Sequence, residues 1–235
     1  MRTMKDRELI MEAQETLTGN RVQFDYVCIG GVNKDVTTDI ERVVKEKLTL
    51  LKQKVAEIEE LFLNNWSLSL KYKGVGTITT ESALRCSVLG PLARASGVDF
   101  DVRNESDYLP YKELGFKSVI EGSGDVHARN MVRLREVFES IRLIEAALDG
   151  LPEGEIASKV KGAPDGESYM RVEAPRGECF YYLKGSKGQY LDRVRIKTPT
   201  FGSVPAMVEA LTGQNYADAP AIIASFDPCL SCTAR

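Results

Sequence analysis

Two cysteines lie three residues apart near the end of this 235-residue sequence, in the run Asp227-Pro228-Cys229-Leu230-Ser231-Cys232. Thiols at this Cys-x-x-Cys spacing can chelate one metal ion or close a redox disulfide. The other cysteines, Cys28, Cys86 and Cys179, are scattered, and an odd total of five does not fit the disulfide framework of a secreted protein. The pair is therefore the first candidate for chemistry.

Several interpretations of the pair compete. A thioredoxin-like disulfide needs its first thiol at the start of a helix, and only three residues follow Cys232, too few for a helix. A structural zinc site needs four ligands, and the remaining candidates are three scattered cysteines and the lone His127. Half of a metal site, completed by ligands from elsewhere, suits soft thiolates, which bind nickel, iron, zinc or copper(I). Two buried thiols without a ligand are the plainest alternative, which the preceding Asp227-Pro228 disfavours.

The composition restricts the class of protein. With 43% hydrophobic and 28% charged residues and a net charge of −3, the chain fits a globular protein of one domain, residues 1–235. Its 31 Lys and Arg residues are balanced by 34 Asp and Glu residues without a long block of either sign, so we expect no nucleic-acid partner. No window approaches the ~20 apolar residues of a membrane span, and the N-terminal stretch lacks the apolar core of a signal peptide. We expect a cytoplasmic protein that can lie peripherally on a membrane complex.

Helices are expected to dominate residues 1–150. A short helix over residues 4–17 stops at Thr18-Gly19-Asn20. Apolar residues at three- and four-residue steps predict a helix of about 25 residues that includes Ile40 to Phe62, and a second long helix over 126–148. Between them, Gly90-Pro91 ends or kinks the helical stretch 81–96.

After residue 150 the spacing of apolar residues changes from that of helices to that of strands. Residues 169–173, 178–183 and 190–196 are typical of strands, and 185–188 is expected to be a hairpin turn. Helical spacing returns over 204–225. The whole predicts an α+β fold, in which a bundle with two long helices is followed, in residues 151–235, by a small antiparallel sheet and a metal-binding C-terminus.

The terminal run from Asp227 to Arg235 resembles the closing motif of nickel-iron hydrogenase large subunits, in the form found in energy-converting, membrane-bound hydrogenases. Residues 173–178 (EAPRGE) and 197–203 (KTPTFGS) resemble the active-site strands of that family in the same order. Segments 17–22, 29–32 and 95–103 resemble stretches shared with the homologous quinone-site subunit of respiratory complex I. The similarity covers essentially the whole chain, as the C-terminal portion of such a large subunit.

This resemblance implies two metal ligands and a charged pair. Cys229 matches the terminal thiolate on nickel, and Cys232 matches the thiolate that bridges nickel to an iron carrying carbonyl and cyanide ligands. Arg176 matches the arginine over the open side of the centre, where it assists the heterolytic splitting of hydrogen. Asp227 matches the aspartate that pairs with this arginine.

The same resemblance implies a cradle for the cyanide ligands. Thr200, together with the backbone near Pro175 and Pro199, matches the groups that hold them. At the end of the chain, the family's motif closes on a basic residue or histidine, after which an extension is cut off. Arg235 is expected to be either this processed end or an end encoded without extension, and arginine there argues against a magnesium ligand.

The family also implies partners. Its large subunits carry a second cysteine pair and an acidic proton relay nearer the N-terminus, and neither is present in residues 1–235. We therefore expect a separate chain with the other pair, an iron-sulfur small subunit that takes the electrons, and membrane subunits, with H2 and protons as substrates. The alternative is a non-catalytic, quinone-site-like or scaffold subunit of a complex I-related oxidoreductase that holds no metal.

Overall fold

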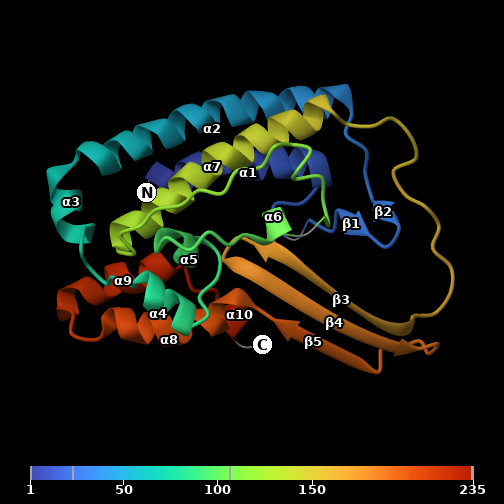
Figure 1. The fold of residues 1–235 in the computed structure, drawn as a ribbon. Helices are drawn as coiled ribbons and strands as arrows, with labels where there is room; N and C mark the ends of the chain where they lie inside the picture. The colour runs from blue at the N-terminus through green and yellow to red at the C-terminus, as the bar shows by residue number, and fades with distance from the viewer. Residues whose placement is uncertain (1, 23, 106, 234–235) are drawn as a thin grey trace. The chain divides into compact units, whose positions relative to one another are not determined.

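The computed structural model of the protein describes residues 2–22, 24–105 and 107–233 (Figure 1). Its contacts divide the chain into two compact units. Unit 1 comprises Met1–Glu60 and Ser140–Gly162, and unit 2 comprises Leu61–Glu139 and Ala163–Arg235. All seven predicted site residues belong to unit 2. The single domain expected over 1–235 stays a prediction.

Unit 1 is built on long helices whose apolar positions recur at helical spacing. The predicted helices are confirmed, and their apolar stripes supply the buried Leu48, Leu51, Val55 and Ile141. Thr37 caps the second helix, because its hydroxyl accepts a hydrogen bond from the Ile40 N–H at 3.4 Å. The helices are α1 (Arg2–Thr18), α2 (Thr38–Asn64), of which residues 38–60 lie in this unit, and α7 (Val126–Asp149), of which residues 140–149 do.

A two-residue hairpin follows α1. Strand β1 (Val27–Cys28) pairs with β2 (Gly31–Val32), and the predicted extended stretch 22–29 is thus only partly a strand. The reason is local, since Gly30 and Gly31 adopt positive φ values of 101° and 158° and reverse the chain at once. The backbone of residues 156–158 then bonds to the hairpin, through Val32 N to Ile156 O and Ser158 N to Gly30 O, both 3.0 Å.

Unit 2 contains several short helices. The predicted interruption at Gly90-Pro91 is confirmed, because one helix ends at Arg85 and the next begins at Pro91. The loop expected over 97–116 contains one helical turn. The helices are α3 (Trp66–Tyr72), α4 (Thr80–Arg85), α5 (Pro91–Ala95), α6 (Val102–Glu105), α8 (Pro199–Leu211), the 3₁₀ turn η1 (Tyr216–Asp218), α9 (Ala219–Phe226) and α10 (Leu230–Thr233), with the first part of α7.

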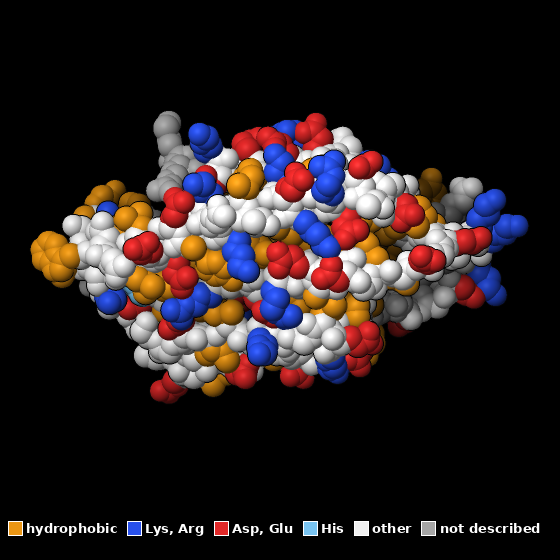
Figure 2. All heavy atoms as spheres, turned by 90° about the horizontal axis from the view of Figure 1, so that it is seen from above, with side chains coloured by type: hydrophobic (Ala, Val, Ile, Leu, Met, Phe, Trp, Pro, Cys, Tyr) orange, Lys and Arg blue, Asp and Glu red, His pale blue; other side chains and the backbone are white. Residues whose placement is uncertain are grey.

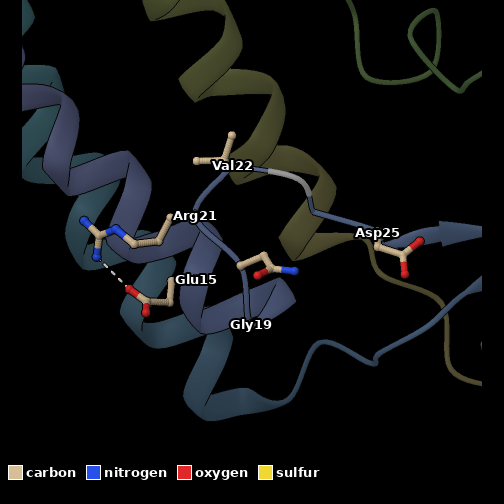
Figure 3. A pocket seen from close by; sticks show the side chains of 6 residues that line it. Glu15, Gly19, Arg21, Val22 and Asp25 are labelled. Carbon is tan, nitrogen blue, oxygen red and sulfur yellow. Dashed lines mark hydrogen bonds and ion pairs between the residues drawn. The ribbon is translucent and has the colours of Figure 1, made fainter.

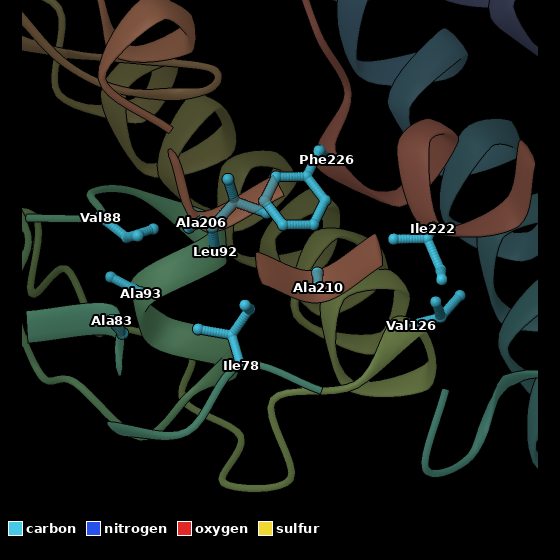
Figure 4. Packing of buried hydrophobic residues seen from close by; sticks show 10 residues of the cluster. All are labelled: Ile78, Ala83, Val88, Leu92, Ala93, Val126, Ala206, Ala210, Ile222 and Phe226. Atoms are coloured by element: carbon cyan, nitrogen blue, oxygen red, sulfur yellow. The ribbon is translucent and has the colours of Figure 1, made fainter. Parts of the chain in front are cut away.

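The core of unit 2 joins segments that are far apart in sequence. Figure 4 shows Phe226 of α9 and Ala206 and Ala210 of α8 converging on side chains from the α4–α5 region. Ile222 and Ala206 are fully buried. This packing fixes the C-terminal helices against residues 78–93, so the segment that follows Phe226 leaves from a rigid base. The cluster comprises Ile78, Ala83, Val88, Leu92, Ala93, Val126, Ala206, Ala210, Ile222 and Phe226.

A three-stranded antiparallel sheet completes unit 2 in the order β3-β4-β5, which confirms the predicted small sheet. Its strands are β3 (Asp165–Ala174), β4 (Gly177–Ser186) and β5 (Arg193–Lys197). The turn predicted at 185–188 lies farther along, over 187–192, because Gly185 still pairs with Gly166 inside the ladder. The α+β class is therefore confirmed, whereas metal binding by the C-terminus stays a prediction.

The surface carries charges of both signs. Figure 2 shows Lys and Arg side chains interspersed with Asp and Glu side chains on the face that it presents. Over the part of the chain that the structure describes, no helix combines the length and the apolar character needed to cross a membrane. Arg235, predicted to close the terminal motif, lies outside the described residues.

Candidate functional site

Arg176 occupies the tight turn between β3 and β4. Ala174 and Gly177 form the last pair of the ladder, which leaves Pro175 and Arg176 as the two turn residues. Gly90, with φ +70°, packs its backbone on this turn, and a Cβ there would lie 2.4 Å from Gly177 Cα and 2.6 Å from Arg176 O. Only glycine fits this approach, so the start of α5 fixes the position of the arginine turn.

Asp227 and Arg176 form the ion pair that the resemblance implies. The guanidinium donates from Nε to Asp227 O at 2.6 Å and from Nη2 to Asp227 Oδ1 at 3.0 Å. Asp227 ends α9 in a left-handed conformation, φ 52°, which aspartate tolerates better than most residues. The two side chains are 31% and 43% exposed, so the pair faces outward and is not sealed in the core.

Two arginines, the buried Arg129 and the partly buried Arg133, hold the end of α9 that carries Asp227, and sequence reasoning did not single them out. Arg133 donates from Nη1 to Ser225 O at 2.6 Å, and Arg129 donates from Nε to Ser225 Oγ at 2.9 Å. Burial lowers the pKa of Arg129 to about 10, and its guanidinium also lies 4.8 Å from the ring centroid of Phe226. The available signal was two arginines four residues apart on a helix, which sequence alone does not distinguish from a solvated face.

The cysteine pair is anchored on the start of α8. The Cys229 N–H donates to Thr200 Oγ1 at 3.4 Å, and the Thr198 hydroxyl donates to Cys232 O. Both thiols are partly exposed. A single helical turn, α10, follows Cys229, so the expectation that no helix follows was wrong, although four residues give only a weak dipole.

The surroundings favour the thiolate form of one cysteine. Hydrogen bonds from Ser231 and from Cys232, followed by the positive charge of Arg176, lower the pKa of Cys229 to about 7. The Ser231 hydroxyl lies 3.1 Å from Cys229 Sγ. Burial and the neighbouring Cys229 raise the pKa of Cys232. Thiolates are the metal-binding form of cysteine, so this donor set fits a soft transition metal with Arg176 beside it.

The ligand set is incomplete within the described part of the chain. No group of three or more His, Cys, Asp or Glu side chains there is arranged to hold a metal ion. Elsewhere in unit 2, the Cys86 thiol donates to Glu209 Oε2 at 3.7 Å, and Cys179 lies on β4. A four-thiolate site at Cys229 and Cys232 would need two further thiols in addition to these.

The predicted cyanide cradle lies at the same place in unit 2. Pro199 and Thr200 are buried in the first turn of α8, while Pro175 is exposed beside Arg176. The Thr200 hydroxyl accepts from Cys229 N, which leaves its own proton to donate. The structure thus brings the seven predicted residues to one region of unit 2, and their role toward cyanide stays a prediction.

A buried ionic cluster includes one residue of the same hairpin, Glu173 of β3. Arg94, 1% exposed, pairs with Asp101 at 2.9 Å, with Glu136 at 2.7 Å and with Glu173 at 3.0 Å. Arg103 adds a second cation, 2.7 Å from Asp101. Burial raises the pKa of Glu173, against the attraction of Arg94. This cluster connects β3 to α5, α6 and α7. Sequence reasoning missed it, although Glu173 and Asp101 belong to segments that resemble the family.

A shallow pocket in unit 1 does not involve any predicted site residue. Its lining residues surround the end of α1, where Arg21 pairs with Glu15 at 2.7 Å (Figure 3). Figure 3 shows Val22 and Asp25 on the chain that leaves the helix toward β1. The candidate chemistry therefore stays with the C-terminal segment of unit 2.

Known proteins with similar sequences include hydrogenases or hydrogenase subunits and subunits of other oxidoreductases. The membrane-bound hydrogenase subunit alpha of Pyrococcus furiosus is 35% identical over 97% of this chain and 58% of its own length. The carbon monoxide-induced hydrogenase of Rhodospirillum rubrum is 35% identical over 100% of this chain and 66% of its own. A subunit of the NADH-quinone oxidoreductase of Clostridium beijerinckii is 34% identical over 96% and 62%. The chain thus spans less than two thirds of these relatives.

One protein-family model matches the whole chain in two overlapping segments. The model described as the 49 kDa subunit of respiratory-chain NADH dehydrogenase matches residues 1–163 and 157–235. This match confirms the predicted relation to the complex I group. It does not reach the finer prediction of a nickel-iron large subunit. The chain belongs to the family of the 49 kDa subunit of respiratory-chain NADH dehydrogenase.

Proposed function

We propose that this chain is a subunit of a nickel-iron hydrogenase that interconverts H2 with protons and electrons, and that it supplies two of the four cysteine ligands of the metal centre. The observation that carries the proposal is the placement of Cys229 and Cys232 beside Arg176, with Asp227 binding two of the guanidinium nitrogens. Two relatives at 35% identity are named as hydrogenases or hydrogenase subunits.

The thiols supply the metal ligands. With its pKa at about 7, Cys229 is substantially a thiolate at neutral pH, and Cys232 loses its proton on binding a metal. A nickel-iron centre with carbonyl and cyanide ligands, when bound, supplies a Lewis acid at which hydrogen is split heterolytically. Thr200 and the backbone near Pro175 and Pro199 would hold the cyanides.

Arg176 supplies a cation close enough to the thiols to lower the pKa of Cys229. Asp227 engages Nε and Nη2, and among the described residues no hydrogen bond engages Nη1. A guanidinium held in this way has lost most of its rotational freedom before the reaction, so its remaining N–H groups can stabilise negative charge without reorganisation. Asp227 balances the cation and sets its orientation.

The proposal requires partners. Residues 1–235 provide one cysteine pair at ligand spacing. Under the proposal, a separate chain provides the other pair. Iron-sulfur clusters in a small subunit would carry the electrons, and membrane subunits would hold the complex at the cytoplasmic face of a membrane, where this chain would lie peripherally. H2 and protons would be the substrates.

A second candidate function is supported by the family itself. The matching family is that of a respiratory-chain NADH dehydrogenase subunit, and a relative at 34% identity is named as a subunit of an NADH-quinone oxidoreductase. Under this alternative the chain is a non-catalytic, quinone-site-like or scaffold subunit of a complex I-related oxidoreductase. Cys229 and Cys232 then bind no metal.

Infrared spectroscopy on the native complex, purified through this chain, tests the proposal together with nickel and iron analysis. The expected result is a set of carbonyl and cyanide stretching bands with about one nickel ion per chain. An intact complex that contains neither nickel nor these bands would overturn the hydrogenase proposal and support the scaffold function.

A further inference from the structure

The outer half of the three-stranded sheet is not covered by the helices of unit 2. All six residues of β3 from 165 to 170 are exposed, whereas residues 171–174, nearer the arginine turn, are partly buried. Figure 1 shows the strands running out from α8 and α10, with β5 at the outer edge. A small sheet without a helix on it needs a hydrophobic face covered by something else to be stable.

One face of this outer half is apolar. The strand register places Met170 beside Tyr181, and Leu183 beside Val194, on the same face, with Ile196 continuing it. Met170 is 52% exposed and Val194 45%. Contiguous apolar side chains at this exposure mark an interaction surface more often than isolated ones do.

The opposite face carries three cations on the edge strand, of which Arg193 acts on Glu167 only at a distance beyond an ion pair. Arg193, Arg195 and Lys197 alternate along β5, so they share a face at intervals of about 6.7 Å. The cations of the inner strands are paired, Lys184 with Glu167 at 2.7 Å and Arg171 with Glu178 at 3.5 Å. For the three cations of β5, no carboxylate of a described residue lies within ion-pair distance.

The backbone of β5 is also free on one side. Its ladder pairs it with β4 alone, from Lys184 with Arg193 to Phe180 with Lys197. No other described strand pairs with it. An edge strand of this kind presents N–H and C=O groups that can accept a further strand.

We propose that β5 is the docking site of an acidic, extended segment of a partner subunit, which adds to the sheet as a fourth strand. Alternating side chains of that segment are Asp or Glu over Arg193, Arg195 and Lys197, and apolar over Val194 and Ile196. The inference rests on the proposed function in so far as that function places the chain in a multi-subunit complex. An anionic lipid surface would neutralise the cations too, but it offers no backbone groups in register with an edge strand.

Zero-length cross-linking with a carbodiimide on the native complex tests the proposal, because it joins a lysine amine to a carboxylate in direct contact. Lys197 is the only lysine on β5. We expect a cross-link from Lys197 to an Asp or Glu in a segment of alternating acidic and apolar residues. Lys197→Arg is the matched control, since it keeps the charge and removes the amine, and it should abolish this cross-link while the complex still forms.

Hydrogen exchange supplies the second measurement. In the complex, alternate amides of residues 193–197 should exchange at least about tenfold more slowly than in the free chain, because only every second amide faces the added strand. The combined variant Arg193→Glu, Arg195→Glu, Lys197→Glu should weaken subunit association about tenfold or more. Reversing Lys71, Lys73 and Lys117, three exposed lysines of unit 2 away from the sheet, should leave association unchanged.

The outcomes separate this proposal from the hydrogenase proposal. Unprotected β5 amides together with no Lys197 cross-link in an intact complex would overturn the docking site, whatever its nickel content. Protection of β5 by vesicles of phosphatidylglycerol, without a cross-link to any subunit, would also overturn it, in favour of a lipid surface. A complex with the expected cross-link but without nickel would support the docking site and contradict the hydrogenase.

Discussion

Glu173 and Arg176 stand three residues apart on one hairpin, yet their charged surroundings differ. Around Glu173 the two guanidinium groups of Arg94 and Arg103 meet three carboxylates, and the side chains of Arg94 and Asp101 are at most 1% exposed. Around Arg176 a single carboxylate, Asp227, is 43% exposed, and the two partly exposed thiols of Cys229 and Cys232 lie nearby. The chain thus completes the first cluster by itself and leaves the second open.

This difference indicates that the cluster around Glu173 and the site around Arg176 have different roles. A buried ionic cluster costs desolvation free energy, which its own partners offset, and it then fixes the strands that carry it. An open site with unsatisfied donors gains its partners from outside the chain. The closed cluster accordingly positions the hairpin, and the open site is where a metal and a second polypeptide would bind.

The largest effect is expected at the open site. Cys229→Ser should abolish nickel retention and hydrogen turnover in the purified complex, because a serine hydroxyl is a poor ligand for a soft metal at neutral pH. Nickel analysis and a hydrogen uptake assay measure the two quantities. The control, Cys28→Ser in unit 1, should change neither. Nickel at the wild-type level in Cys229→Ser would contradict its assignment as a ligand.

Substitutions in the buried cluster around Arg94 should lower the free energy of unfolding. Arg94→Met leaves Asp101, Glu136 and Glu173 around a neutral side chain, and removing one partner of a buried ion pair costs about 3–5 kcal/mol of unfolding free energy. Urea unfolding followed by circular dichroism measures it. Arg171→Met, which removes a pair that is 40% exposed at the arginine, should cost at most about 1 kcal/mol. Equal losses in the two variants would show that the cluster does not stabilise the fold.

Arg176→Lys tests whether Arg176, unlike Arg94, acts in the reaction rather than in the stability of the fold. Lysine keeps the charge but cannot present Nε and Nη2 to Asp227 at once, so turnover should fall about 100- to 1,000-fold while nickel stays bound. Steady-state hydrogen turnover and metal analysis on the same sample distinguish the two effects. If the variant proves as active as the wild type, the proposed role of Arg176 is wrong.

The smallest effect concerns pH. Burial raises the pKa of Glu173 in the folded chain above its unfolded value of about 4.3, so the folded state holds the proton more tightly. Glu173 therefore contributes a free energy of unfolding that is present below pH ~4.3 and is lost as the pH rises through the folded pKa. Glu173→Gln should remove this decline. Urea midpoints at intervals from pH 4 to pH 7 test it, and an unchanged slope would show that another group titrates.

The sequence predicted the elements better than the contacts. The two long helices, the interruption before Pro91 and the small sheet follow from periodicity and from Gly and Pro, which act within a few residues. The connection from β4 to β5 was misplaced because Gly185 was taken for a turn residue, and it lies in the ladder instead. Cross-strand register depends on partners that a local pattern does not contain.

For the candidate site, the sequence by itself determined which groups are available: the Cys-x-x-Cys pair, Arg176 and Asp227, at fixed spacings along the chain. The resemblance also implied the pair of Asp227 with Arg176, 51 residues apart, but only the tertiary structure shows what holds it, namely the left-handed end of α9 and the bonds of Arg129 and Arg133 to Ser225. It also distinguished the Glu173 side chain, 4% exposed, from the Arg176 side chain, 31% exposed, on one hairpin. The physical reason is that donor chemistry belongs to the residue, whereas burial, charge balance and pKa depend on which distant segments pack around it.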